Sequence, residues 1–525
     1  MIIQENKIDK YIAWLLIISA LLRGFFAAYI ELGNDEVYYW TYAMYPDWSH
    51  FDHPGMVGWV IQLFSLNLMF TSEFALRLSS VLFATINTYL IYRLGSEIKN
   101  KLAGFYAALL YTSSLYVFVM IGVFILPDTP LNLFLLLSIY CFIRSFKEKR
   151  GEIVDRSYKR KKNIYMVLGG FFAGLAMLSK YSAFFIWVGV GLYVLFYDRK
   201  QFKNIFIYIS GILTILCTIP IMIWNIQNKF ISFTFHGDRV DFSGHIQPKS
   251  YLVEILGEIG YNNPVNFVLV IIALVALLRG ARYLDKMPRR FLLLFALPFV
   301  GLFWYFSLTR PILPHWSAPA VTMLLLFPAS YLADKHPFAN GKVKLPKSIV
   351  AALSILLFVL TVGTLEIKTG IVPLNLDEKS KTISNYGDMD VTASIYGWRS
   401  IKDDFQKIRE KRIAEGSMNR EDAMIGLKWF PMANFDYYVA HPLGIKMLGL
   451  REVHEIHKYA WINGYRGGFK KGANYWFLND SSDYYDPEEY LYNYFDRVTP
   501  CDTITVDRCG KPAKYIFVYM CKGLK

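Results

Sequence analysis

The sequence predicts a polytopic all-α membrane protein that ends in a separate soluble α/β domain, and three observations support this fold class. Of the 525 residues, 54% are hydrophobic and 19% are charged. Eleven strongly apolar stretches before residue 369 are long enough to cross a bilayer core of roughly 30 Å as helices. The residues after Lys368 instead have the polar and aromatic composition of an ordinary soluble domain.

The first apolar stretch, residues 11–30, contains Arg23, and no small-residue cleavage site follows it before the acidic segment at residues 31–36. We therefore expect a retained helix instead of a removed signal peptide. Ten further spans are expected at residues 76–94, 102–124, 130–146, 163–179, 181–197, 204–224, 264–279, 289–308, 314–333 and 348–366.

Basic loops set the expected topology. With a cytoplasmic N-terminus, the loops at residues 147–162, 199–203 and 279–290 lie inside, as the positive-inside rule requires. The apolar segment 56–70 is short, and counting it as a span would move these basic loops outside, so we expect an interfacial helix there. The formal charge of +14 thus reflects membrane topology. We expect membrane lipids as partners and no nucleic acid.

An odd number of spans places residues 369–525 on the outer side. Alternating apolar runs at 423–427 and 515–519 predict strands, and the charge mix of 400–415 predicts a helix. The expected domains are thus a membrane domain, residues 1–368, and a small α/β domain. The latter holds three of the five cysteines, and an oxidising compartment would permit one disulfide among them. These three are Cys501, Cys509 and Cys521.

The first outer loop, residues 31–75, carries the most chemistry. Asp35 and Glu36 stand at a helix end, and Asp52 and His53 follow within the same loop. Ionisable residues at a bilayer edge are costly to keep, which makes them functional candidates. The alternative is that Asp35 caps a short helix with Glu36 in its first turn. The residues alone leave both interpretations open.

Three other ionisable residues fall at the outer ends of expected spans. Asp128 precedes the span 130–146 and could instead be a helix N-cap. Lys180 lies between two apolar blocks without a hydrophilic loop, where it could instead extend to the membrane surface. His315 lies in a short outer turn and could be a structural histidine.

Carboxylates and cations at one membrane face match the needs of sugar transfer from a lipid phosphate. A carboxylate can take the proton of an acceptor hydroxyl, and cations can stabilise the departing phosphate. Two alternatives stay open. A glycolipid transporter or flippase would place its charges near the midplane, and a degenerate relative would serve as a scaffold.

Several motifs occur in a characteristic order along the chain: Asp35-Glu-Val-Tyr-Tyr-Trp40, Phe51-Asp-His-Pro54, Ala75-Leu-Arg-Leu-Ser79, Asp128 and Ser179-Lys-Tyr181. Through them the chain resembles the GT-C superfamily glycosyltransferases, family 39-like, the group of protein mannosyltransferases, aminoarabinose transferases and bacterial galacturonosyltransferases. The resemblance implies a multi-span GT-C fold and a sugar donor linked to polyprenyl phosphate, with inversion at the anomeric carbon. It implies an envelope lipid, glycan or protein as acceptor, at the periplasmic face of a bacterial cytoplasmic membrane.

The resemblance also implies residue roles. Asp35 matches the catalytic base, Glu36 would position the acceptor, and Asp128 matches the second acidic site. Lys180 would bind the donor phosphate together with Tyr181 and His53. His53 stands where related lipid-modifying transferases have a lysine, which puts their particular sugar in doubt. Supporting roles fall to Arg77, Asp52 and His315.

No cofactor is firmly expected, and a divalent cation is left open. Four residues have side chains that can bind a metal ion, but their spacing in the sequence is not that of a known metal-binding motif: Asp52, His53, His236 and His245. The last two lie in the segment 225–263, which we expect to be a long loop that shapes access to the site.

Overall fold

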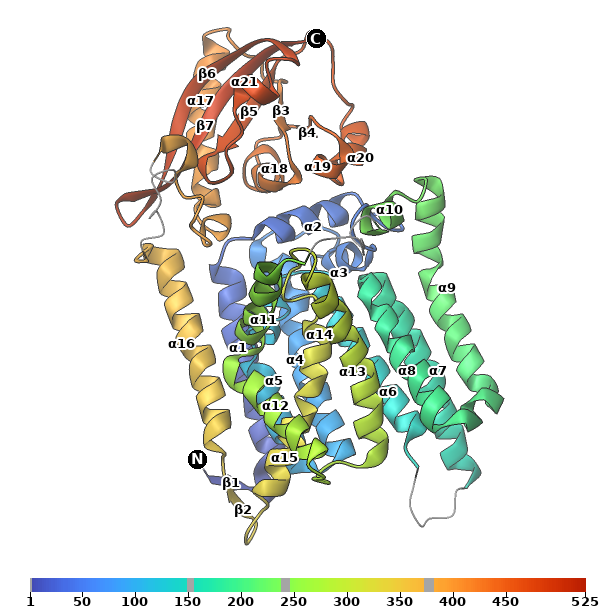
Figure 1. Ribbon diagram of the computed structural model, residues 1–525. Coiled ribbons are helices and arrows are strands. Elements are labelled where there is room, and N and C mark those ends of the chain that lie inside the picture. The colour runs from blue at the N-terminus through green and yellow to red at the C-terminus, as the bar shows by residue number, and fades with distance from the viewer. Residues whose placement is uncertain (1, 149–154, 238–245, 373–381) are drawn as a thin grey trace. The chain divides into compact units, whose positions relative to one another are not determined.

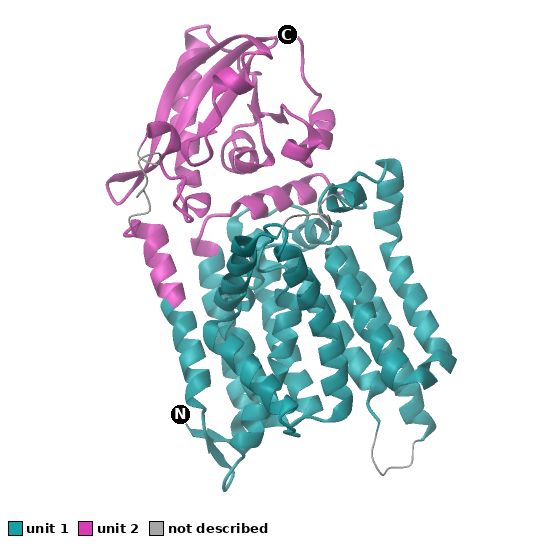
Figure 2. Cartoon of the chain, viewed as in Figure 1, with its two compact units in different colours: residues 1–27, 47–358 teal, residues 28–46, 359–525 magenta. Residues whose placement is uncertain are grey.

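The computed structural model describes residues 2–148, 155–237, 246–372 and 382–525 (Figure 1). It divides into two compact units (Figure 2). Unit 1 comprises residues 1–27 and 47–358, and unit 2 comprises residues 28–46 and 359–525.

Unit 1 is a bundle of helices, and all eleven expected spans fall on helical segments. Seven described helices are long and apolar enough to cross a membrane. These are α1 (Ile8–Tyr29), α4 (Glu73–Ile98), α6 (Asp128–Phe146), α7 (Arg156–Ser179), α9 (Ile205–Gln227), α13 (Lys286–Ser307) and α16 (Lys347–Thr369).

The other four expected spans are shorter or broken, which corrects the expectation of eleven continuous helices. The span 102–124 ends early as α5 (Lys101–Ser113), because Ser114 is extended, and a π-helical turn follows at Tyr116–Met120. The span 181–197 is a 3₁₀ turn followed by α8 (Phe185–Tyr197). The span 314–333 is split into α14 (Ala318–Leu324) and α15 (Leu326–Lys335).

The described parts of the segment 225–263 are mostly helical, so the expectation of a long loop was wrong for them, whereas residues 238–245 lie outside the described residues. The segment contains the end of α9 and the helices α10 (Ile231–Gly237) and α11 (Pro248–Asn262). The next helix, α12 (Pro264–Leu278), turns by 100° from α11, and the residue between them, Asn263, has a φ of 73°. Together these two helices count as an eighth span at most. The expected interfacial helix appears as α3 (Met56–Phe64).

Small residues let the helices of unit 1 approach closely. A Cβ on Gly95 of α4 would lie only 2.8 Å from the Cα of Gly104 of α5, so the absence of a side chain lets these two helices touch. On α7, the carbonyl of Gly170 accepts a 2.7 Å hydrogen bond from the Thr214 hydroxyl of α9. Close packing at small residues and hydrogen bonds from hydroxyl groups stabilise the association of helices within a membrane.

The outer surface of the bundle is apolar. On α9, Ile215 is 65% exposed, and on α16 Phe358 is 67% exposed. Such side chains are stable where lipid surrounds the helices. The structure is therefore that of a multi-pass membrane protein. At one end of the bundle, β1 (Ile2–Gln4) pairs antiparallel with β2 (Lys342–Lys344).

Unit 2 holds a five-stranded mixed sheet in the order β4-β3-β5-β7-β6. Its strands are β3 (Ala423–Gly426), β4 (Met447–Gly449), β5 (Tyr475–Asp480), β6 (Phe495–Arg508) and β7 (Lys511–Leu524). Strand β3 runs parallel to β4 and β5, whereas β5, β7 and β6 are antiparallel. The strands expected at 423–427 and 515–519 lie on β3 and β7. The helices are α17 (Trp398–Ala414), α18 (Trp429–Phe435), α19 (Val453–Ile456), α20 (Tyr459–Tyr465) and α21 (Pro487–Tyr490).

The three cysteines of the C-terminal region are free thiols in the structure, which has none of the disulfides that an oxidising compartment would permit among them. Cys521 is buried in β7, and Cys509 is exposed. The Sγ of Cys501 accepts a hydrogen bond of 3.0 Å from the Nε of Arg412.

The helix after the first span, α2 (Asn34–Met44), packs within unit 2. Tyr38 lies 5.2 Å from the ring of Trp429, and Trp40 lies 5.2 Å from the ring of Tyr437. Both side chains are buried. The aromatic residues of the first outer loop therefore form a core with the C-terminal residues, although the sequence-based domain boundary lies at residue 368.

Candidate active site

A buried ion pair forms the centre of the candidate site in unit 1. Helix α6 begins at Asp128, and helix α7 ends at Ser179, so that Lys180 follows in an extended conformation. The Nζ of Lys180 lies 2.7 Å from Oδ2 of Asp128. Their side chains are 11% and 4% exposed, so the pair is largely shielded from solvent. Lys180 thus does not extend outward, and the Asp128 carboxylate binds a cation instead of capping its helix.

Two residues that the sequence analysis missed form a hydrogen-bond chain to the Asp128 carboxylate of this pair. The hydroxyl of Tyr116 donates a 3.0 Å hydrogen bond to Oδ1 of Asp128, and the amide of Asn132 donates to that hydroxyl at 2.7 Å. Asn132 stands one helical turn after Asp128, a spacing that could have identified it. Tyr116 comes from the π-helical turn after α5, and no sequence spacing signals its position.

His53 and His315 lie close enough to the pair to interact with it electrostatically. His315 interacts with both Lys180 and Asp128. Burial lowers the pKa of His53 to about 3, Asp52 opposes this shift, and Lys180 adds to it. His53 is therefore neutral at pH 7 and carries one N–H donor. The structure brings four expected residues together here: Asp128, Lys180, His53 and His315.

The loop that carries His53 is held against α10 and α9. An imidazole nitrogen of His236, on α10, lies 2.8 Å from the backbone oxygen of Asp52. The ring of Tyr181 lies 5.1 Å from the ring of His236. The hydroxyl of Tyr181 lies 2.9 Å from the hydroxyl of Ser232, which is also on α10. Tyr181 thus faces α10, and Asp52 contributes a backbone contact.

Arg77, on α4, contacts two other segments of unit 1. Its fully buried guanidinium group donates a 3.2 Å hydrogen bond to the carbonyl of Ala27 and lies 5.3 Å from the ring of Phe124. These contacts connect three segments of unit 1. Through the contact with Phe124, Arg77 supports the segment between α5 and α6.

Asp35 and Glu36 belong to the first turn of α2, in unit 2. The buried Glu36 carboxylate accepts a 2.9 Å hydrogen bond from the backbone N–H of Gly33, which precedes the helix. Glu36 therefore performs the capping that the alternative interpretation gave to Asp35. Asp35 is exposed on the same turn.

No group of three His, Cys, Asp or Glu side chains within the described residues could hold a metal ion. His245, one of the four ligand types named from the sequence, lies outside the described residues.

The comparisons with known proteins agree with this fold. The family described as dolichyl-phosphate-mannose-protein mannosyltransferase matches residues 52–224. Undecaprenyl phosphate-alpha-4-amino-4-deoxy-L-arabinose arabinosyl transferase 2 of Proteus mirabilis is 25% identical over 358 residues, which cover 63% of this chain and 60% of that protein. The chain therefore spans less than two thirds of that relative's length.

Solved structures extend the likeness to nearly the whole chain. ArnT from Cupriavidus metallidurans, in a crystal structure bound to undecaprenyl phosphate, has a TM-score of 0.63 at 14% identity, covering 97% of this chain and 98% of that one. The apo oligosaccharyltransferase of Archaeoglobus fulgidus has a TM-score of 0.50 at 13% identity, covering 90% and 69%. These likenesses show that the chain shares the overall fold of ArnT. The chain is thus similar to mannosyltransferases and aminoarabinose transferases, the group that its motifs resemble.

Proposed function

We propose that the protein is a membrane glycosyltransferase that moves a sugar from a polyprenyl-phosphate donor to an envelope lipid, glycan or protein, with inversion at the anomeric carbon. The observation that carries this proposal is the buried Asp128–Lys180 pair with a neutral His53 nearby. Both members of the pair lie in the segment that the mannosyltransferase family matches. The ArnT structure holds undecaprenyl phosphate, the kind of lipid phosphate that a donor of the proposed class releases when its sugar is transferred.

Lys180 is proposed to bind the donor phosphate, with His53 and Tyr181 beside it. A cation fixed in a shielded site stabilises negative charge that develops on a leaving phosphate. Asp128, held by Tyr116, fixes the ammonium group of Lys180 before the donor arrives. The Lys180 ammonium has three donors, so binding of Asp128 leaves two for phosphate oxygens.

Asp35 is proposed as the catalytic base. The acceptor hydroxyl oxygen attacks the anomeric carbon while its proton passes to the Asp35 carboxylate. The bond from that carbon to the phosphate oxygen breaks, and its electron pair leaves on the phosphate. The exposure of Asp35 fits a carboxylate that an acceptor must reach. Glu36, which caps α2, would keep this turn in place for the acceptor.

The proposal includes the topology. Eleven crossings, some of them broken, would place the active site and residues 369–525 on the periplasmic side of a bacterial cytoplasmic membrane. The basic loops 199–203 and 279–290 support this orientation through the positive-inside rule. Cys509 offers a test because it is exposed. A membrane-impermeant maleimide should label it in spheroplasts, and Cys509→Ser should lose that label. Labelling that needs membrane disruption would contradict this orientation.

A transfer assay tests the function. Wild type, Asp35→Asn and Asp388→Asn are purified in detergent and supplied with radiolabelled polyprenyl-phosphate sugars and envelope extract. Asp388 is the matched control because it is an exposed aspartate of unit 2. Wild type and Asp388→Asn should transfer label, whereas Asp35→Asn should be slower by about 10²- to 10⁴-fold, the contribution of a general base.

Equal transfer by Asp35→Asn would remove this residue from the role of base. Absence of transfer by the wild type with every donor would overturn the enzyme assignment. The known proteins compared above give no support to the transporter alternative.

A further inference from the structure

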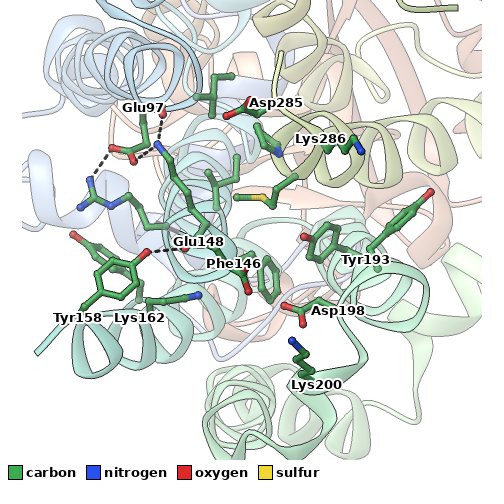
Figure 3. Close-up of a pocket in the computed structure, with 18 of the residues that line it drawn as sticks. Glu97, Phe146, Glu148, Tyr158, Lys162, Tyr193, Asp198, Lys200, Asp285 and Lys286 are labelled. Atoms are coloured by element: carbon green, nitrogen blue, oxygen red, sulfur yellow. Dashed lines mark hydrogen bonds and ion pairs between the residues drawn. The ribbon is translucent and has the colours of Figure 1, made fainter. Parts of the chain in front are cut away.

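A cavity of about 1140 Å³ opens between the ends of α6, α7, α8 and α13 (Figure 3). It lies far from the Asp128–Lys180 pair. Its wall contains Arg144 and Lys147 from the end of α6, whereas Asp128 begins that helix. A helix of 19 residues is roughly 28 Å long, so the cavity and the pair lie at opposite ends of the bundle.

Three of the five acidic residues of this cavity, Glu97, Asp155 and Asp198, are engaged with protein groups. Glu97 forms 2.9 Å ion pairs with Arg144 and with Lys147, which Figure 3 shows as dashed lines. Asp155 accepts a 2.6 Å hydrogen bond from the backbone N–H of Tyr158 at the start of α7. Asp198 accepts a 2.8 Å hydrogen bond from the side chain of Gln201.

Basic residues outnumber acidic ones in the wall, by seven to five. Lys161 and Lys162 come from α7, and Lys200 comes from the 3₁₀ helix Arg199–Lys203. Within the described part of the chain, no ion pair joins these three lysines to an acidic side chain, although Glu148 and Asp198 interact with Lys162 electrostatically from a greater distance. Three ammonium groups from two separate elements therefore line one cavity whose wall has more basic than acidic residues.

One flank of the cavity is apolar and exposed. The rings of Phe146 and Tyr193 pack 4.9 Å apart in its wall. Phe196 and Tyr197 also line it, yet they are 59% and 47% exposed. Leu195, next to them on α8, is 43% exposed. A ligand held by the lysines thus has a hydrocarbon-compatible surface directly beside it.

We propose that this cavity binds the anionic headgroup of a membrane phospholipid, with the phosphate at Lys161, Lys162 and Lys200 and the acyl chains along the exposed face of α8. The chemistry shared by candidate ligands is a phosphate anion. The apolar flank favours a lipid over free phosphate, and the surplus of lysines favours an anionic over a zwitterionic headgroup. Basic pockets between membrane helices have this property in general. The inference does not depend on sugar transfer.

Native mass spectrometry of the full-length protein in detergent tests it. The protein is titrated with phosphatidylglycerol, with phosphatidylcholine of the same acyl chains, and with inorganic phosphate. The test variant is Lys161→Gln/Lys162→Gln/Lys200→Gln. The matched control is Lys342→Gln/Lys344→Gln, because these exposed lysines lie on β2 and do not line the cavity.

Wild type should bind phosphatidylglycerol at least tenfold more tightly than phosphatidylcholine. Each lysine replaced in the cavity should weaken phosphatidylglycerol binding about fivefold, and the control variant should bind like wild type. Thermal denaturation checks that each variant is folded. Equal affinity for both lipids, or an equal loss in the control variant, would overturn the proposal. Inorganic phosphate that binds as tightly as phosphatidylglycerol would show a free-anion site and overturn the assignment to a lipid.

Discussion

The two units each bury a lysine against an aspartate, but they surround the two cations differently. In unit 2, Lys514 lies 3.2 Å from Asp480, donates to the carbonyl of Ala393 at 3.1 Å and stands 3.3 Å from the centre of the Trp398 ring. In unit 1, Asp128 is the one hydrogen-bond acceptor of Lys180 within the described residues.

This difference separates a structural cation from one that can bind a substrate. Lys514 and Asp480 are 1% and 0% exposed, and burial lowers the pKa of Lys514 while Asp480 opposes that shift. Its ammonium group is saturated by protein groups. Lys180 keeps donors for another anion, and its pair is somewhat more accessible. Burial of an ion pair alone therefore does not mark an active site, whereas a buried cation with free donors is what the proposed phosphate-binding role of Lys180 requires.

The sharpest test of this comparison is Lys180→Met. Loss of the cation should slow transfer by about 10²- to 10³-fold, the typical effect of removing one group that stabilises developing negative charge. Donor affinity should fall as well. Initial rates with a labelled donor measure the effect, and thermal denaturation must show that the variant still folds. Transfer at the wild-type rate would end the proposed role of Lys180.

Lys514→Met should instead affect stability. It leaves the Asp480 carboxylate buried and unpaired, which costs about 3–5 kcal/mol. Limited proteolysis and thermal denaturation would show a loosened unit 2. Adding Asp480→Asn to the variant should restore most of the loss, because no unpaired charge remains. The exposed pair Lys407–Asp404 supplies the control, because solvent screens it and Lys407→Met should leave the melting temperature almost unchanged. A Lys514→Met protein as stable as this control would contradict the structural assignment.

Tyr116→Phe should have a smaller effect on the candidate site. It removes one hydrogen bond to a charged carboxylate, an interaction worth about 1.5–3 kcal/mol, so transfer should fall about ten- to a hundredfold. Tyr106→Phe is the matched control, because that buried hydroxyl has no hydrogen-bond partner within the described residues. A similar loss in both variants would assign the effect to general packing instead of Asp128.

The smallest effect is expected from His53→Asn, measured as thermal stability between pH 7 and pH 4. The pKa of His53 is about 3 in the folded protein, well below the ordinary value of 6.5. Between these values the unfolded chain binds a proton that the folded protein does not, so stability falls as the pH falls through this range. The variant lacks this proton uptake, so its melting temperature should fall less steeply. Identical slopes would show that His53 is not shielded.

Much of this arrangement could be read from the residues. The positions of the spans, the strands at β3 and β7, and the ionisable residues Asp128 and Lys180 were all expected. Apolar length determines a membrane helix because a backbone in lipid must satisfy its own hydrogen bonds. A charged residue at the end of such a helix stands out for the same energetic reason.

Other features depended on packing between distant segments. Lys180 meets a carboxylate 52 residues earlier, and Tyr116 reaches that carboxylate from a π-helical turn. The breaks in the spans at Ser114 and Asn263 follow local conformations that apolar composition does not reveal.

The sequence by itself thus determined which segments enter the membrane and which side chains are costly enough there to be functional, because both follow from local composition. Only the tertiary structure decided that Lys180 is paired but unsaturated, that Lys514 is saturated, and that α2 packs with the C-terminal residues. These are matters of non-local packing, in which the free energy of a charge depends on every group that surrounds it.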